Sequence, residues 1–332
     1  MSEASDLSQK EARPTTILHK KTTQITLIII LILILALVLA LFTKLYFFQK
    51  QVIGFTGYDL SLDFFHSMEV GIKGEAETLG YNFLSYDQGS DETKLVTSFK
   101  RLIEENVDAI IVSPISPEVL PPLVDSAHQK NIPVIINDIG GGDSDYDAIV
   151  ISDNWQGGVI AAQYTTNYLK GREGSREVAI ITVEPSAVYA SRRGDAYKET
   201  IEASGFKVIS EISAYSKQED GYTSMKLILE EHPKLVAVFA ENDPMAVGAA
   251  NAIAEAGRKD ILVVGFNGDQ IAKDAIAAGL MQATVAQNPT EMGRITVKLA
   301  DRLIHKKEIT FDDPDKREIF VPVEMMTISN IG

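Results

Sequence analysis

Beyond residue 50, short runs of aliphatic and β-branched residues alternate with longer stretches in which apolar residues recur every three or four positions. The short runs predict buried strands, and the longer stretches predict helices with one apolar face. In the first half of this region the pattern predicts strands at 52–55, 81–86, 109–112, 133–136 and 148–151. Helices are expected between the first four strands, at about 63–79, 95–103 and 117–131.

A second round of the same alternation follows. Strands are expected at 178–183, 206–212, 235–239, 261–264, 282–285 and 319–323, and helices at 155–169, 191–204, 222–231, 244–256, 269–278 and 290–304. Such alternation is typical of parallel sheets with helices on both faces. The helix-to-strand corners at 77–81 and 202–206 are similar, which favours two similar lobes over one large sheet. The predicted fold class is therefore α/β, with two lobes that each hold a parallel sheet flanked by helices.

Polar residues follow several of the predicted strands. Open parallel sheets bind ligands at the carboxyl ends of their strands. Carboxylates, amides and an arginine suit the hydroxyls of a polyhydroxylated ligand, and aromatic rings suit the C–H faces of a sugar. The alternative is that these residues only cap helices and form turns, where Asp, Asn and Ser are common. The candidate binding residues are Phe64, Phe65, Ser113, Asp138, Arg193, Asn242, Asn267 and Gln287.

The amino-terminal region has a different pattern. Every residue from 25 to 42 except Thr26 is apolar, and 45–48 extend the run. About 24 residues at about 1.5 Å rise would cross a bilayer. Lys10, Arg13, Lys20 and Lys21 precede the run, so the positive-inside rule predicts that the amino terminus is in the cytoplasm. The prediction is a disordered cytoplasmic tail at 1–24 and a transmembrane signal anchor at 25–48. The alternative is a cleaved signal peptide, whose apolar core is normally roughly 7–15 residues long.

Charge and composition restrict the function classes. The net charge is −15, with +3 in residues 1–50 and −18 in the rest, which disfavours binding of nucleic acid by the acidic part. The absence of cysteine excludes disulfides, thiolate metal sites and thiol nucleophiles. The five histidines have no metal-ligand spacing, and neither a nucleophile elbow nor a phosphate-binding loop occurs. No cofactor, metal site or enzymatic activity is expected.

Several motifs together resemble the periplasmic binding proteins of the ribose-binding type, which share their core with LacI-type repressors. The resemblance covers residues from about 51 to 329. Its stretches are the paired aromatics at 63–65, the strand at 132–138 that ends in Asp138, the segments 152–158 and 191–194, and the segments 239–249 and 263–268.

The resemblance implies two lobes joined by three hinge crossings, with a sugar held between them. It implies an amino-terminal lobe of 51–153 plus 288–316 and a carboxy-terminal lobe of 154–287 plus 317–332. Phe64, Phe65, Ser113 and Asp138 would face the sugar from the first lobe, and the other candidates from the second lobe and the hinge. Ribose binders carry Asp-Arg where this chain has Asp138-Ile139, and Phe-Asp where it has Phe266-Asn267. A monosaccharide other than ribose is therefore expected.

Two functions remain open. The first is a membrane-anchored extracytoplasmic protein that captures a monosaccharide and delivers it to the permease of an ABC transporter. The second is a sensing module of the same fold that presents its ligand-bound state to a membrane sensor kinase. The uncleaved anchor favours sensing, because transport binders are usually released or attached through a lipidated cysteine. Either way, the protein is expected in the cell membrane with a single pass and its binding domain outside.

Overall fold

The computed structural model describes residues 26–39, 50–185 and 187–331. The chain divides into two units, residues 1–50 and residues 51–332. In the first unit, residues 26–39 form a helix whose leucine, isoleucine and valine side chains are exposed. Within the described ranges, no helix combines the length and apolar character needed to span a membrane. The predicted tail at 1–24 lies outside the described residues, as do residue 25 and residues 40–48 of the predicted anchor.

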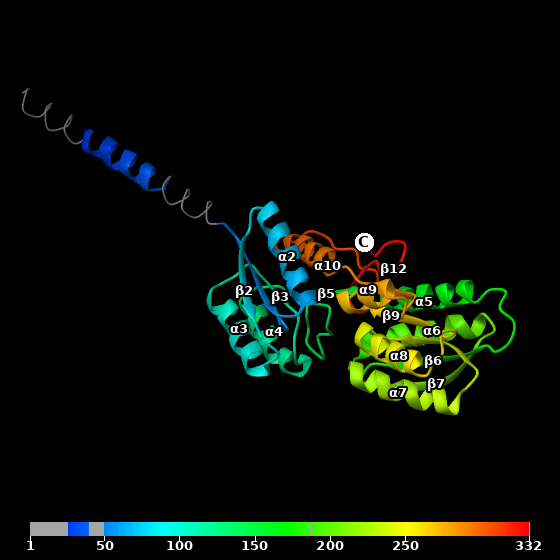
Figure 1. Cartoon of the computed structure of the whole chain (residues 1–332). Helices are drawn as coiled ribbons and strands as arrows, with labels where there is room; N and C mark the ends of the chain where they lie inside the picture. The colour runs from blue at the N-terminus through cyan, green and yellow to red at the C-terminus, as the bar shows by residue number, and fades with distance from the viewer. Residues whose placement is uncertain (1–25, 40–49, 186, 332) are drawn as a thin grey trace, which may run out of the picture. The chain divides into compact units, whose positions relative to one another are not determined.

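The second unit contains two six-stranded sheets, visible in Figure 1 as two groups of arrows. The strand order of the first sheet is β11-β5-β4-β3-β1-β2. All its described pairings are parallel. The strands span β1 (Val52–Gly57), β2 (Asn82–Asp87), β3 (Ala109–Val112), β4 (Val134–Asn137), β5 (Ala148–Ser152) and β11 (Glu318–Val321).

The second sheet repeats this arrangement with the order β12-β10-β9-β8-β6-β7. Its pairings are parallel except that β12 runs antiparallel to β10. The strands span β6 (Glu177–Thr182), β7 (Lys207–Ser213), β8 (Leu235–Ala240), β9 (Leu262–Asn267), β10 (Ala283–Ala286) and β12 (Glu324–Thr327). The confirmed fold class is thus α/β with two lobes.

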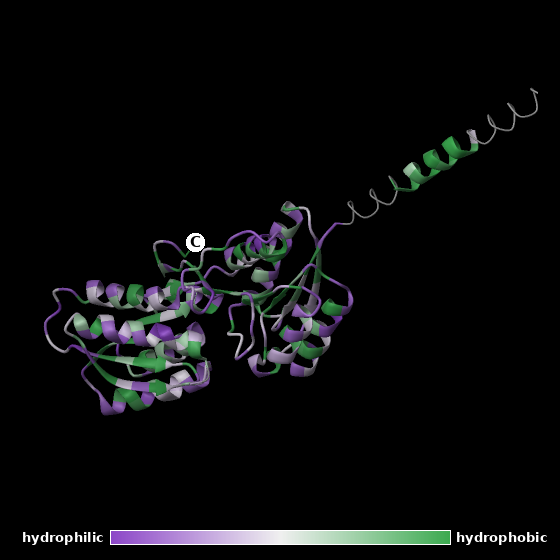
Figure 2. Cartoon of the chain, turned by 180° about the vertical axis from the view of Figure 1, so that it is seen from behind, coloured by the Kyte–Doolittle hydropathy of each residue, from purple (hydrophilic) through white to green (hydrophobic). Residues whose placement is uncertain are grey.

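Helices cover both faces of the first sheet, which explains why its central strands are apolar along their whole length. One face packs against α2 (Asp63–Thr78) and α10 (Pro289–Ile304), through residues such as Met68 and Val297. The other face packs against α3 (Glu92–Glu104) and α4 (Leu120–His128), which follows a short 3-10 turn at Pro117–Val119. Figure 2 shows apolar residues concentrated along the strands and polar residues on the outer faces of the helices.

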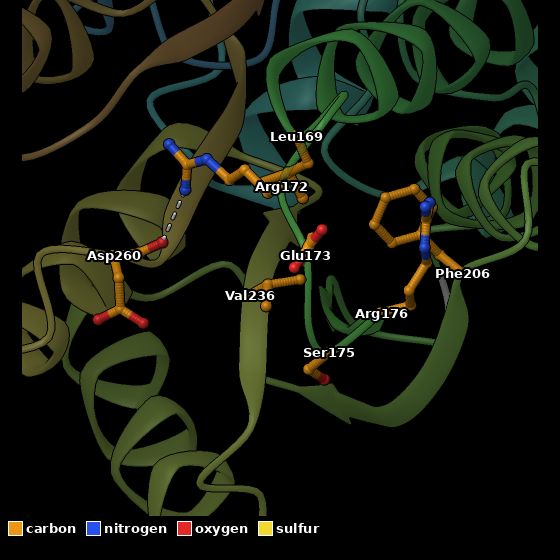
Figure 3. A pocket seen from close by; sticks show the side chains of 8 residues that line it. All are labelled: Leu169, Arg172, Glu173, Ser175, Arg176, Phe206, Val236 and Asp260. Carbon is orange, nitrogen blue, oxygen red and sulfur yellow. Dashed lines mark hydrogen bonds between the residues drawn. The ribbon is translucent and has the colours of Figure 1, made fainter.

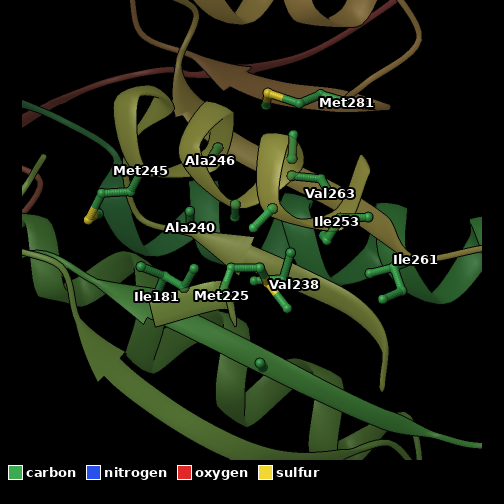
Figure 4. Packing of buried hydrophobic residues seen from close by; sticks show 14 of the residues in the cluster. Ile181, Met225, Val238, Ala240, Met245, Ala246, Ile253, Ile261, Val263 and Met281 are labelled. Carbon is green, nitrogen blue, oxygen red and sulfur yellow. The ribbon is translucent and has the colours of Figure 1, made fainter. Parts of the chain in front are cut away.

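The second sheet is covered in the same way. On one face lie α5 (Asn154–Tyr168) and α6 (Val188–Ala203). On the other lie α7 (Gln218–Glu231), α8 (Asp243–Glu255) and α9 (Gln270–Ala277). Figure 4 shows this second layer, where Met225, Ala246 and Met281 surround the side chains of β8 and β9. The small alanines of α8 let the helix lie close to the sheet.

The chain passes between the two sheets three times. The passages lie between Ser152 and Asn154, between Ala286 and Pro289, and between Val321 and Glu324. The last differs from the sequence expectation, which placed all of 317–332 in the second lobe and one strand at 319–323. Instead β11 pairs with β5 in the first sheet and β12 pairs with β10 in the second. An apolar run indicates that a strand is buried but not which sheet edge it joins. The pattern alone could therefore not show that this region forms two strands in different sheets.

Candidate ligand-binding site

Arg193 lies on α6 and is held by contacts from three other elements of its lobe. Its Nε donates to Asn154 Oδ1 at 2.7 Å, and its Nη1 donates to the carbonyl oxygen of Glu241 at 2.9 Å. Its guanidinium carbon lies 3.8 Å from the centroid of the Phe266 ring, a cation–π arrangement. A planar guanidinium clamped on two edges and one face has little freedom to rotate.

Two glycines permit this arrangement because they bring α5, α6 and the end of β8 close together. A Cβ on Gly158 would lie 2.1 Å from the carbonyl oxygen of Arg193. A Cβ on Gly194 would lie 2.1 Å from Oε1 of Glu241. Neither glycine has a positive φ, so their role is close approach rather than unusual backbone conformation. The motif Arg193-Gly194 therefore places the arginine and makes room for the carboxylate behind it.

Buried carboxylates surround Arg193. Glu241 accepts from the backbone N–H of Val183 at 2.7 Å, and Asp243 accepts from Thr284 Oγ1 at 2.6 Å. Burial raises the pKa of each to about 7, partly offset for Glu241 by its backbone hydrogen bonds and the charge of Arg193. Burial also raises the pKa of Asp269. For Arg193, burial lowers the pKa to about 10 and these carboxylates oppose the shift.

Asp138 belongs to the other lobe and follows the carboxyl end of β4. Its φ is +66°, a left-handed conformation that aspartate tolerates better than most residues do. Its pKa is raised to about 6 because burial outweighs the opposing effect of the positive charge of Arg193. Among the described residues, no group donates a hydrogen bond to its carboxylate. An acceptor without a hydrogen bond, held in a left-handed backbone conformation at a strand end, is typical of a functional position.

A chain of amides connects the site to two of the lobe crossings. Ser152 Oγ donates to Gln287 Oε1 at 2.8 Å, and Gln287 Nε2 donates to Asn267 Oδ1 at 2.9 Å. Asn267 also accepts a longer bond, 3.5 Å, from Arg193 Nη1. Ser152 and Gln287 stand at the first and second crossings, so a rotation of the lobes would act directly on these side chains.

The other predicted site residues have local packing or capping contacts. Phe65 is buried and stacks on Tyr58 with ring centroids 5.0 Å apart, while half-buried Phe64 meets Phe65 edge-on. Ser113 is buried and donates to Met68 Sδ at 3.4 Å. Asn242 accepts from the backbone N–H of Met245 and so caps α8.

The structure thus connects Arg193, Asn267 and Gln287 by hydrogen bonds, brings Asp138 within electrostatic range of Arg193, and gives Ser113 and Asn242 structural contacts. Asn154, Glu241 and Asp269 were not predicted from the sequence to support Arg193. Asn154 and Glu241 lie inside the motifs at 152–158 and 239–249, and this adjacency was the available signal. Asp269 accepts from Asn267 Nδ2 at 3.0 Å, and its position two residues after a strand-end amide was the corresponding hint.

A separate small pocket lies at the other end of the second sheet (Figure 3). It has a volume of about 170 Å³ and is lined by residues before β6, β7 and β9 and by Val236 of β8. Its two arginines already have partners, because Arg172 lies over Tyr168 and donates to the Asp260 carbonyl, and Arg176 lies over Phe206. The amino ends of parallel strands are not where such sheets bind ligands, so this pocket is not the candidate site.

Comparisons with known proteins identify the chain's relatives. The family model described as a periplasmic binding protein domain matches residues 53–308. The ribose import binding protein of Bacillus subtilis is 34% identical over 269 residues, covering 80% of this chain and 86% of the relative. The D-allose-binding periplasmic protein of Escherichia coli is 32% identical over 257 residues, covering 72% and 80%. These relatives are binding proteins rather than enzymes, as expected.

Solved structures agree with this grouping. A periplasmic ribose ABC transporter structure from Conexibacter woesei is 26% identical, with a TM-score of 0.76 over 85% of this chain and 93% of that one. A solute binding protein from Bacillus halodurans with bound myo-inositol is also 26% identical, with a TM-score of 0.70 over 85% and 96%. The resemblance seen in the sequence motifs is confirmed.

Proposed function

Because this chain belongs to the periplasmic binding protein family, we propose that it captures a monosaccharide between its two lobes and delivers it to an ABC transporter. The observation that supports this most directly is the relation between Asp138 and Arg193. They come from opposite lobes, and the charge of each shifts the pKa of the other. A sugar hydroxyl placed between them could donate to the carboxylate and accept from the guanidinium.

The proposed site departs from a ribose binder at two positions. Ile139 follows Asp138 where a ribose binder carries arginine, and Asn267 follows Phe266 where it carries aspartate. An amide both donates and accepts, whereas a carboxylate only accepts, so the pattern of hydroxyls that is recognised changes. Relatives and structural neighbours are described with ribose, D-allose and myo-inositol. We propose a neutral polyhydroxylated ring of this size as the ligand, held by Asp138, Arg193, Asn267 and Gln287 with Phe64 near the mouth of the site.

We further propose that residues 25–48 anchor the protein in the membrane. The sequence run is apolar, and the described helix at 26–39 exposes apolar side chains on all sides. A helix of this composition is stabilised by an apolar surrounding. Mass spectrometry of the membrane fraction should detect peptides from residues 1–21. A mature chain that begins after residue 40 and remains in the soluble fraction would contradict this proposal.

The partner of the loaded protein has two candidates. Import relatives favour a permease, and the proposed anchor favours a sensor kinase, because a tethered binder stays beside a membrane receptor. Co-purification of the full chain from detergent-solubilised membranes, with and without sugar, distinguishes them by the partner recovered. Recovery of a transporter permease supports delivery, and recovery of a kinase supports sensing.

The ligand proposal is tested by a thermal-shift screen of the full chain in detergent against monosaccharides and cyclitols. A ligand present at about 100 times its Kd adds about 2.7 kcal/mol to the free energy of unfolding and raises the melting temperature. D-Ribose, D-allose and myo-inositol form the first set, and sugar phosphates form a negative control because the site has several buried carboxylates. If no neutral sugar or cyclitol changes the melting temperature, the proposed function is wrong.

A further inference from the structure

Arg192, the neighbour of Arg193 on α6, makes a contact between the lobes rather than within its own. Its two terminal nitrogens donate to the two carboxylate oxygens of Glu318, each at 2.9 Å. Glu318 begins β11 in the first sheet, whereas α6 packs on the second. The Glu318 side chain is 1% exposed and that of Arg192 is 23% exposed. This is a bidentate ion pair that is largely removed from water.

Two tyrosines extend the same contact. The guanidinium carbon of Arg192 lies 4.5 Å from the centroid of Tyr189, one turn earlier on α6. Tyr146, which lies in the loop before β5, packs with Tyr189 against the same apolar cluster, and its hydroxyl donates to the carbonyl oxygen of Lys316 at 3.2 Å. The Tyr189 ring covers Gly140 so closely that a Cβ there would be 2.4 Å from it. Tyr189 packs with the apolar cluster of the first lobe although it belongs to a helix of the second.

We propose that Arg192, Glu318, Tyr189 and Tyr146 form an interlobe latch that holds Arg193 in its sugar-binding position. Arg192 and Arg193 are adjacent on one helix and move together, so a rotation that moves this lobe away from Asp138 also displaces Arg192 relative to Glu318. The latch therefore forms together with the binding-competent arrangement of the lobes and stabilises it. Arg192 acts as a positioning residue, since it contacts Glu318 and not the site. The expected effect on sugar affinity rests on the proposed function, whereas the expected effect on the distance between the lobes does not.

The balance of charges explains why such a latch can open. The attraction within a buried ion pair is largely offset by the free energy needed to remove both charges from water. The closed arrangement of the lobes is therefore favoured only modestly over one in which both charges are hydrated. Removing one partner while the lobes stay closed leaves a buried charge unpaired, which drives the lobes apart. If only a fraction of molecules is binding-competent, the apparent Kd is raised in inverse proportion to that fraction. Loss of the latch should therefore weaken sugar binding, although none of the latch residues is proposed to contact the sugar.

The test measures the distance between the lobes without any ligand. The chain has no cysteine, so Lys100→Cys on α3 and Glu230→Cys on α7, both exposed, accept a pair of spin labels in the full-length protein. We expect Arg192→Met to shift the label distances to longer and broader values. The double variant Arg192→Met/Glu318→Met leaves no buried charge unpaired, so its shift should be smaller than that of Arg192→Met. Arg192→Lys keeps a positive charge opposite Glu318 but lacks the bidentate fork, so its shift should lie between the parent and Arg192→Met.

A matched control comes from the same helix. Lys198 pairs with Glu211 at 2.5 Å, and both residues belong to the second lobe. Lys198→Met removes a cation of α6 without removing an interlobe contact, so its label distances should equal those of the parent. Unchanged or shorter distances in Arg192→Met would overturn the latch.

Affinity gives the second readout. With D-ribose and D-allose as probes, Arg192→Met should raise the Kd about fivefold or more for any probe that binds the parent. A binding probe whose Kd is the same in both proteins would also overturn the proposal. If neither probe binds the parent, this counts against the proposed ligand class. The label distances, which are measured without ligand, still test the latch.

Discussion

The guanidinium of Arg193 lies face to face with the ring of Phe266, which is itself fully buried. With Nε and Nη1 bonded to Asn154 and Glu241, Nη2 is the one guanidinium nitrogen without a hydrogen bond to the described residues. The arginine is thus fixed by its own lobe and still has a donor to offer. An arginine that is already immobilised loses little side-chain entropy when a ligand binds.

This geometry predicts the effect of removing either charged residue. Asp138→Ala and Arg193→Ala should each cost about 1–3 kcal/mol of binding free energy or more, because a ligand hydroxyl would lose its buried partner. Calorimetry with a sugar identified by the thermal-shift screen measures this. Asp143→Ala, which removes an exposed carboxylate nearby in the chain, is the control and should bind as the parent does. Equal affinities for all four proteins would show that the site is elsewhere.

The hydrogen bonds of Arg193 to Asn154 and Glu241 also predict that Arg193→Ala and Asp138→Ala differ in stability. Arg193→Ala should lower the free energy of unfolding by about 1–3 kcal/mol, since Asn154 loses a buried partner. Asp138→Ala should cost less, up to about 1 kcal/mol, because no described group donates to that carboxylate and only the poorer fit of alanine to the left-handed backbone is added. Urea unfolding of the two variants compares them. A larger loss for Asp138→Ala than for Arg193→Ala would contradict this description of their contacts.

Trp155 should report the movement of the lobes. It is the single tryptophan, lies at the second position of α5 beside the first crossing, and is 47% exposed. Hinge-adjacent residues change their surroundings when two lobes close on a ligand. Adding the correct sugar should therefore give a saturable change in intrinsic fluorescence. A sugar that binds by calorimetry and compacts the protein in small-angle scattering, yet leaves the emission spectrum unchanged, would count against this expectation.

Glycines on two helices should respond in opposite ways to the same substitution. Gly158→Ala would place a methyl group against the backbone of α6, so we expect a loss of stability and a displaced Arg193. Gly74 lies on α2 with no atom within 4 Å of its ideal Cβ, so Gly74→Ala should stabilise the protein by up to about 1 kcal/mol. Thermal melting compares the two variants. Equal melting temperatures would refute the close approach of α5 and α6.

Buried Asp243 predicts how stability depends on pH. Its ordinary pKa of 3.8 is raised to about 7 in the folded state, by burial first and then by the charge of Asp269. Between these values the folded state holds a proton that the unfolded state has released, so stability falls as pH rises from about 4 to 7. One such group contributes a slope of up to about 1.4 kcal/mol per pH unit.

Asp243→Asn isolates this contribution. The amide can still accept the backbone N–H of Asp269 with its oxygen and donate to Thr284 Oγ1 with its nitrogen. Urea unfolding at pH 5 and pH 7.5 should show a smaller difference for this variant than for the parent. The same difference in both proteins would mean that Asp243 is ionised throughout.

Much of this fold could be predicted from periodicity alone. The apolar strands are buried on both faces, and this produced the continuous runs from which the sheets were inferred. Helix boundaries shifted where side-chain contacts decide them, as at α6, which begins at Val188 rather than at residue 191. The turn there places Tyr189 against the other lobe, a tertiary contact that local propensity does not encode.

The site was predictable only in part. Strand ends identified Asp138 and Asn267, because parallel sheets bring their carboxyl ends to one edge. The partners of Arg193 could not be deduced, since its contacts with Asn154 and Glu241 span 39 and 48 residues of sequence. Arg192 and Arg193 are adjacent and chemically identical, and only their directions in space give them different roles.

The pairing of β11 with β5 has a consequence for how the protein is made. The first sheet lacks its edge strand until residues 318–321 have been synthesised, although its other five strands lie within residues 52–152. Contacts this far apart in sequence form slowly, because a long loop must be closed before they are gained. The β5 edge stays open to wrong partners until then. A ribosome or translocation channel that releases the chain from its amino terminus would therefore leave the first lobe without this edge strand until residue 321 has emerged.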